Sequence, residues 1–211
     1  MYVPKHFEQS EIAVIQALIV AHPLGSLVTV GPAGLSANHI PFELVADAGP
    51  YGRLVGHVAR ANPVWREVSG ELQALVIFQG ANAYITPSWY PSKQDGGRVV
   101  PTWNYVAVHV YGAIRVVDDP DKLKAHVDQL TRRQESAFLH PWSVGDAPTG
   151  FTEKMLGAIV GLEIDIARLE AKWKVSQNRS GQDREGVAEG LRTLGTPFAD
   201  QMADYVEGAG R

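Results

Sequence analysis

Residues 103–117 read WNYVAVHVYGAIRVV, and this stretch decides the fold class. Its even-numbered positions carry mostly β-branched residues, namely Val106, Val108, Val110, Ile114 and Val116. Its odd-numbered positions carry aromatic and polar residues, namely Trp103, Tyr105, His109, Tyr111 and Arg115. Because side chains alternate between the two faces of a strand, the sequence predicts one long strand whose valine face lies in a core. The aromatic face must then contact a ligand, a second subunit or water.

Further strands are predicted on both sides of this stretch. A hairpin is expected between Ser26–Val30 and Leu35–Val45, because Gly31-Pro32-Ala33-Gly34 between them is a turn sequence. The other predicted strands are Arg53–Arg60, Ala74–Gln79 and Leu162–Ile166. The strands mostly follow one another without alternating with helices. This order favours a mainly β fold, an antiparallel barrel with peripheral helices, over a doubly wound parallel sheet.

The helices are predicted at the periphery of the barrel. Ser10 is a suitable N-cap for a helix that ends near Ala21, and Asp119-Pro120 begins another helix with a capping carboxylate and a proline at the first position. The remaining predicted helices are Thr152–Val160, Asp183–Leu194 and a last one from Thr196 to Val206. We expect residues 1–211 to form a single domain with a C-terminal helical extension from about residue 181.

The composition is that of an ordinary globular protein. The 211 residues are 45% hydrophobic and 20% charged, which excludes wholesale disorder. The formal net charge of −4 argues against the broad basic face that nucleic-acid binding usually needs, although a local basic patch remains compatible with it. The chain has no cysteine, so a disulfide framework, a thiolate metal site and a cysteine nucleophile are all excluded.

Targeting signals are not expected in this sequence. The first residues lack the basic and apolar regions of a signal peptide, and the apolar stretch Ile12–Val20 is too short to span a bilayer. We therefore expect a cytoplasmic protein.

Familiar catalytic motifs are also missing from the sequence. It contains no G-x-S-x-G, no Walker loop, no G-x-G-x-x-G and no H-E-x-x-H. The seven histidines are scattered without metal-ligand spacing, so no metal site is predicted and each histidine is expected to be packed or exposed.

Three polar clusters are candidates for a binding site. The first, Gly56–Pro63, combines His57, Arg60 and Asn62 at a strand end, where Arg60 is suited to clamp a phosphate. The competing interpretation is an ordinary strand-to-helix corner with Asn62 as the helix cap.

The second cluster joins Tyr84–Tyr90 to Val100–Tyr105, and its aromatic rings, hydroxyls and amides suit a flat ligand with polar edges. The alternative is an aromatic cluster at a sheet edge or a dimer interface. The third cluster, Lys172–Ser180, is locally basic and suits a phosphate or heterocycle carbonyl oxygens, or else is a solvated loop.

Taken together, these segments resemble the PaiB-like family of FMN-binding negative transcriptional regulators, over nearly the whole chain. The segments that carry the resemblance are residues 1–7, Ala37–Phe42, Gly56–Pro63, Phe78–Gly80, Tyr84–Tyr90, Val100–Tyr105 and Ser176–Arg179. Ala81 and Ala171 stand where the family pattern has proline and glycine, which affects loop shape and leaves the polar positions intact.

The resemblance implies a split antiparallel β-barrel related to the pyridoxamine-phosphate-oxidase type, a homodimer, and FMN at the subunit interface. It also joins the three clusters into one FMN site. The implied cofactor-binding residues are His57, Arg60, Asn62, Thr86, Ser88, Trp89, Trp103, Asn104, Tyr105, Lys174, Gln177, Asn178 and Arg179. The last four are expected to reach in from the partner chain.

Three functions remain open from the sequence. The family name implies transcriptional repression, either directly on DNA or through flavin-linked metabolism, yet no basic recognition helix is evident. The alternative is an FMN-dependent oxidoreductase or flavin reductase with no DNA binding, for which fold analogy is the only support. A haem-binding split barrel ranks third, because no haem motif is present. Catalytic residues are not assigned.

Overall fold

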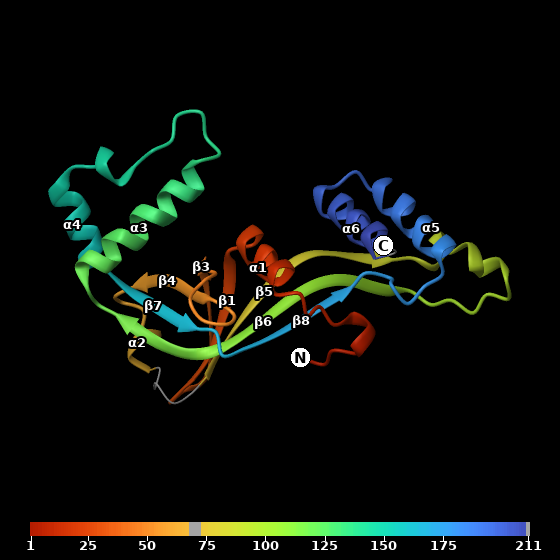
Figure 1. Ribbon diagram of the computed structural model, residues 1–211, viewed down its shortest axis with the longest axis horizontal. Helices are drawn as coiled ribbons and strands as arrows, with labels where there is room; N and C mark the ends of the chain where they lie inside the picture. The colour runs from red at the N-terminus through yellow and green to blue at the C-terminus, as the bar shows by residue number, and fades with distance from the viewer. Residues whose placement is uncertain (68–72, 210–211) are drawn as a thin grey trace. The chain divides into compact units, whose positions relative to one another are not determined.

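The computed structural model describes residues 1–67 and 73–209. In the sheet, the strands follow the order β2-β1-β5-β6-β7-β4-β3, and β8 pairs with β6. The strand pairs described below are antiparallel. The chain divides into two compact units, and the residues of strands β5 and β6, which Figure 1 labels, are shared out between the two. Unit 1 comprises residues 1–18, 78–109 and 170–211, and unit 2 comprises residues 19–77 and 110–169.

Unit 2 contains most of the sheet and the two middle helices. Its elements are β1 (Leu24–Gly31), β2 (Gly34–Pro41), β3 (Glu43–Val45), β4 (Arg53–Ala59), α2 (Val64–Glu67), the start of β5 (Gln73–Ile85), the end of β6 (Thr102–Val117), α3 (Pro120–Glu135), η4 (Val144–Asp146), α4 (Thr149–Gly157) and β7 (Ile159–Asp165). The predicted hairpin is confirmed, since β1 and β2 pair from Leu24↔Pro41 to Gly31↔Gly34. Gly34 closes the turn with φ of 102°, a left-handed conformation that favours glycine.

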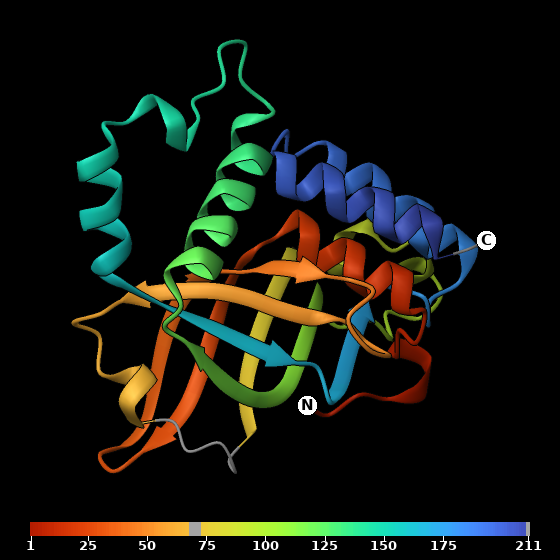
Figure 2. The same cartoon turned by 60° about the vertical axis from the view of Figure 1, so that its left-hand side comes forward.

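Strand β4 lies between two other strands of unit 2. It pairs with β3 on one side and with β7 on the other, from Arg53↔Asp165 to Ala59↔Ile159. Helix α3 lies across these strands (Figure 2). Its N-cap is the predicted Asp119, whose carboxylate accepts hydrogen bonds from the amides of Asp121 and Lys122. The cap fixes where α3 starts, and therefore which of its side chains meet the sheet.

Unit 1 contains the two C-terminal helices and the N-terminal segment. Its elements are η1 (Lys5–Phe7), the first part of α1 (Ile12–Ala21), the second part of β5, η2 (Pro87–Trp89), η3 (Pro91–Gln94), the first part of β6, most of β8 (Arg168–Lys174), α5 (Gly181–Arg192) and α6 (Pro197–Gly208). Helices α5 and α6 pack side by side in both views (Figures 1 and 2). Ser180 and Thr196 cap them with their hydroxyls.

The predicted valine face of β6 is largely confirmed. Val106, Val108 and Val110 are fully buried, whereas Val116 is 37% exposed because it lies near the end of the strand. Strand β8 was not predicted, because its charged residues Arg168, Glu170, Lys172 and Lys174 resemble a solvated loop. Among the described residues, none of the helices is long and apolar enough to cross a membrane.

Candidate functional site

The second and third predicted clusters meet in unit 1. The ammonium group of Lys174, at the end of β8, donates to the hydroxyl of Thr102 and to the carbonyl of Trp103, 2.6 Å away, at the start of β6. The amide of Asn104 donates to the hydroxyl of Ser176 at 2.9 Å. The sequence segments around residues 102–105 and 174–179 therefore form one site, although some 70 residues separate them along the chain.

Three cations gather at this site, and we call Lys172, Lys174 and Arg179 the cationic cluster. Lys172 is buried and donates to the carbonyl of Tyr2 at 3.2 Å, while Arg179 stacks on the ring of Tyr90, 4.7 Å from its centroid. Burial lowers the pKa of Lys174 from its ordinary value, and the positive charges of Lys172 and Arg179 lower it further. The charged form of Lys174 is thus less favoured than in a free lysine, and a nearby anion would stabilise it.

Ser176 is the one non-glycine residue with a positive φ, 64°, among the residues that the structure describes. Its side chain is buried, and so is the side chain of Asn104, which is 1% exposed. The left-handed conformation costs free energy in a serine, so it persists because the surrounding contacts hold it. The Asn104–Ser176 hydrogen bond is one of these contacts, and it shapes the loop that carries the predicted residues Gln177, Asn178 and Arg179.

Aromatic rings border the same site. Trp103 is 56% exposed and Tyr84 is 49% exposed, and the two rings meet edge to face with 6.1 Å between centroids. Tyr105 lies 5.2 Å from the ammonium of Lys172. Exposed aromatic faces beside lysine, arginine and hydroxyl donors fit a ligand that combines a flat ring with a phosphate group.

Other predicted residues have local partners. Gln177 bonds the backbone of Val175 and Trp173 within its own loop. Thr86 caps η2 by accepting from the amide of Ser88, and Trp89 packs against Gly190 of α5. Asn178 is exposed. Their cofactor contacts stay predictions.

The first predicted cluster lies in unit 2, where Arg60 has several internal partners. Its guanidinium forms a two-point ion pair with Asp118, at 2.9 and 2.5 Å, and donates to the carbonyls of Gly157 and Ile159. The hydrogen bond between Arg60 and Asp118 lowers the pKa of Asp118 and raises the pKa of Arg60. A phosphate would have to compete with Asp118 for this arginine, so its role as a phosphate ligand stays a prediction.

Asn62 lies at the corner between β4 and α2 and caps the helix, as the competing interpretation of the first cluster predicted. Its side-chain oxygen accepts from the amide of Val64 at the start of α2, and its amide donates to the side chain of Asn38. These bonds stabilise the corner after β4. A contact between Asn62 and the cofactor stays a prediction.

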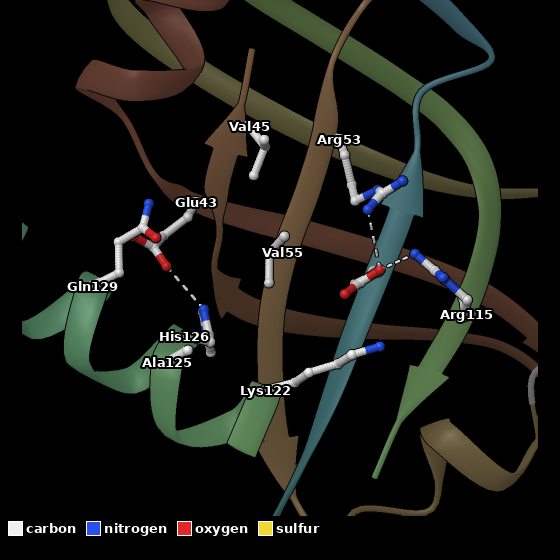
Figure 3. Close-up of a pocket in the computed structure, with 10 residues that line it drawn as sticks. Glu43, Val45, Arg53, Val55, Arg115, Lys122, Ala125, His126 and Gln129 are labelled. Carbon is white, nitrogen blue, oxygen red and sulfur yellow. Dashed lines mark hydrogen bonds and ion pairs between the residues drawn. The ribbon is translucent and has the colours of Figure 1, made fainter. Parts of the chain in front are cut away.

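His57 belongs to a chain of polar side chains that the sequence analysis missed. The Nδ1 atom of His57 lies 3.0 Å from Nε2 of His126, and Nδ1 of His126 lies 2.8 Å from a carboxylate oxygen of Glu43. Glu43 and His126 line a cavity of about 360 Å³, and Glu163 lines it as well. Figure 3 shows Glu43 and His126 at the wall of this cavity together with Arg53 and Arg115. Both arginines form ion pairs with Glu163. Burial lowers the pKa of His57, and the nearby His126 lowers it further, while Glu43 opposes the shift.

Strand β8 and the contact between Glu43 and His126 were both missed by sequence reasoning, for different reasons. The alternation of charged and apolar residues over Arg168–Lys174 was a usable signal for a strand, and it would have placed Lys172 and Lys174 on one face. By contrast, no local pattern joins Glu43 to His126, because 83 residues separate them along the chain.

Sequence comparisons identify the family. Residues 1–168 match the model of the family described as "Putative FMN-binding domain". The chain is 33% identical over 207 residues to the "Protease synthase and sporulation protein PAI 2" of Bacillus subtilis, which covers 98% of this chain and 97% of that protein. It is also 34% identical to an uncharacterized protein of Emericella nidulans, over 100% of this chain and 98% of the relative.

Structural comparisons identify the fold. A conserved hypothetical protein of Mycobacterium tuberculosis superimposes with a TM-score of 0.58 at 14% identity, covering 85% of this chain and 94% of that one. The "FAD and Heme binding protein" of Mycobacterium smegmatis gives a TM-score of 0.57 at 19% identity, over 79% and 73% of the two chains. The predicted split antiparallel barrel with peripheral helices is confirmed. The chain belongs to the PaiB-like family of FMN-binding split-barrel proteins, whose cofactor is the flavin FMN.

Proposed function

We propose that this chain binds FMN with the phosphate against the cationic cluster and with the ring system along Trp103 and Tyr84. The observation that carries the proposal is the arrangement around Lys174, which is a partly buried ammonium group between two other cations. Placing three positive charges together costs free energy in the free protein. A phosphate dianion would offset that cost, and Thr102 would contribute a hydroxyl.

The proposed regulatory function rests on the flavin and not on DNA contact. Bound FMN supplies hydride and one-electron chemistry, whereas this chain has no cysteine that would add thiol redox chemistry. The relative from Bacillus subtilis is named for protease synthesis and sporulation, and we propose that this chain is likewise a regulator, in which residues 1–211 act as one FMN-binding domain.

The C-terminal helix pair argues against direct reading of DNA. Helices α5 and α6 are joined by four residues, 193–196, as in a helix-turn-helix, but α6 carries Asp200, Asp204 and Glu207 and has no lysine or arginine. Arg192 of α5 is engaged by Asp204 and Glu207. An acidic second helix would repel the phosphate backbone of DNA.

We further propose that the protein is a cytoplasmic homodimer. Exposed apolar side chains such as Phe138 and Leu139 support a second subunit, and the absence of cysteine is compatible with a reducing compartment. Light scattering on the FMN-loaded protein should give the mass of two chains, and a monomer mass would contradict this part of the proposal.

The FMN site is tested by replacing Lys174 with glutamine. We expect Lys174→Gln to weaken FMN binding by about tenfold to a hundredfold, because a charge-assisted hydrogen bond to phosphate is lost. Flavin absorbance or fluorescence during titration measures the affinity. Lys93→Gln, which removes an exposed lysine of η3, is the matched control and should leave the affinity unchanged.

Arg60→Ala distinguishes the two phosphate assignments. With the phosphate at the cationic cluster, this variant should bind FMN like the wild type. A large loss of affinity in Arg60→Ala together with wild-type affinity in Lys174→Gln would overturn the proposal and would favour the phosphate site at the first cluster.

Direct DNA binding is tested by gel shift. We expect no specific shift of DNA from the regulated promoters at physiological salt, with or without FMN, because of the acidic face of α6. A shift that survives competition by non-specific DNA would show that the protein regulates by binding DNA itself.

A further inference from the structure

The Glu43–His126–His57 chain is the most unusual polar feature of unit 2. The three residues come from β3, α3 and β4, and the side chains of Glu43 and His126 are only 5% and 6% exposed. His126 is hydrogen-bonded to Glu43 at 2.8 Å and to His57 at 3.0 Å, so each side chain contacts the next one directly. We call these three residues the relay.

The relay ends at a second cavity. His57 lines a cavity of about 230 Å³ whose other walls come from α3, η4, α4 and the start of β7. The walls are mostly apolar, with Trp142, Phe151, Met155 and Leu156 among them, and His57 is the one titratable residue that lines the cavity. Trp142, Phe151 and Met155 are partly exposed, so the cavity opens to solvent. An enclosed cavity of roughly 150 Å³ accommodates benzene, and this larger, open one has room for a compound of one or two rings.

The hydrogen bonds of the relay determine which nitrogen of neutral His57 carries the hydrogen. A carboxylate only accepts, so Nδ1 of His126 carries the hydrogen that Glu43 receives. In neutral His126 the Nε2 atom is then an acceptor, and Nδ1 of His57 must be the donor between the two rings. Neutral His57 therefore keeps a lone pair on Nε2, at the end of the relay.

One added proton removes this acceptor. When His57 takes up a proton, both of its ring nitrogens carry hydrogens, and Nε2 no longer has a lone pair. The titratable groups that act on His57 are His126 and Glu43. The lowered pKa of His57 agrees with a neutral ring near physiological pH.

We propose that this cavity binds a small aromatic compound with a ring N–H, which donates its hydrogen to Nε2 of His57, and that uptake of a proton by the relay weakens this binding. The aromatic and thioether side chains of the wall suit a ring. The lone pair on Nε2 of His57 favours a ligand that donates a hydrogen bond. This site does not depend on the FMN site proposed above, because the ligand has no charge and contacts neither the cationic cluster nor Trp103.

The test compares two probes that differ in one hydrogen. Indole donates through its ring N–H, whereas 1-methylindole has nearly the same shape and no donor. Calorimetric titration of the wild-type protein at about pH 8 should show indole binding about tenfold more tightly than 1-methylindole. As the pH is lowered until His57 takes up a proton, the advantage of indole should disappear, and because the pKa of His57 is lowered, this loss should occur at a lower pH than for an ordinary histidine.

Variants locate the effect in the cavity. His57→Phe keeps a ring at this position and should make the two probes bind equally. Ala147→Phe should fill the cavity and abolish the binding of both probes. His39→Phe, which changes an exposed histidine of β2, is the control and should preserve the preference for indole. If His57→Phe does not fold, the pH dependence of the wild type still decides the proposal.

Several outcomes would overturn the inference. Equal binding of the two probes by the wild type at about pH 8 would exclude His57 as the acceptor. Failure of both probes to bind would show that the cavity does not accept rings, as would be expected if a second subunit covers it. Release of flavin from FMN-loaded protein on addition of indole would show that the cavity belongs to the flavin site, whereas failed FMN binding with normal indole binding would contradict only the proposed function.

Discussion

Replacing Gly186 by alanine is expected to lower the free energy of unfolding by about 3 kcal/mol or more. A Cβ atom at this position of α5 would overlap the carbonyl oxygen of Trp89 in η2. Because that oxygen is a backbone atom, it cannot rotate away as a side chain would. The overlap is relieved only if α5 moves away from η2. The same helix passes over the ring of Trp89 at Gly190, where a Cβ atom would also overlap. Urea unfolding followed by tryptophan fluorescence measures the loss.

Gly208 provides the matched control for this substitution. It lies in the last turn of α6, and a Cβ atom there would have no neighbour within 4 Å among the described residues. Gly208→Ala should leave stability unchanged or raise it by up to about 1 kcal/mol, because alanine favours the helix. Similar stability of the Gly186→Ala variant and the wild type would show that α5 does not approach η2 this closely.

Replacing His126 by leucine is expected to cost about 3–5 kcal/mol of stability. The carboxylate of Glu43 would lose its partner while remaining buried, and its second oxygen already has no hydrogen bond among the described residues. An uncompensated buried charge is much more costly than a missing apolar contact. Equilibrium unfolding in urea near neutral pH measures the change.

The double variant Glu43→Leu/His126→Leu separates the charge from the packing. Two leucines remove both polar groups, so the double variant should be more stable than the single variant by at least about 2 kcal/mol. The half-buried His57 would lose one partner in both variants, so this loss cancels from the comparison. A double variant as unstable as the single one would show that packing of the imidazole, and not the charge of Glu43, is what His126 contributes.

The fold was largely predictable because its signals are local. The alternation in residues 103–117 predicted β6 with its buried face, and Gly31–Gly34 predicted the β1–β2 turn. Asp119 predicted the start of α3, since a capping carboxylate acts on amides two and three residues away. The predicted strand Leu35–Val45 is divided into β2 and β3 around Phe42, directly after Pro41, a proline that cannot donate to a strand ladder and that was a usable signal for the break.

The site was less predictable because its partners are distant in sequence. Lys174 and Thr102 were both in candidate clusters, but their contact depends on how β8 pairs with β6. Asn104 shares the parity of the buried valines, and this was the one local hint that its amide would need a buried partner. Arg60 shows the opposite case: its residue type suits a phosphate, and the fold supplies Asp118 as a competing anion.

The left-handed Ser176 has a consequence for how a ligand associates. The loop after β8 is already held in one conformation by Asn104 before any ligand arrives. The entropy of ordering the loop is therefore lost during folding and not during binding. A preorganised loop of this kind needs no slow rearrangement, so association at the cationic cluster should be a single step whose rate rises in proportion to ligand concentration.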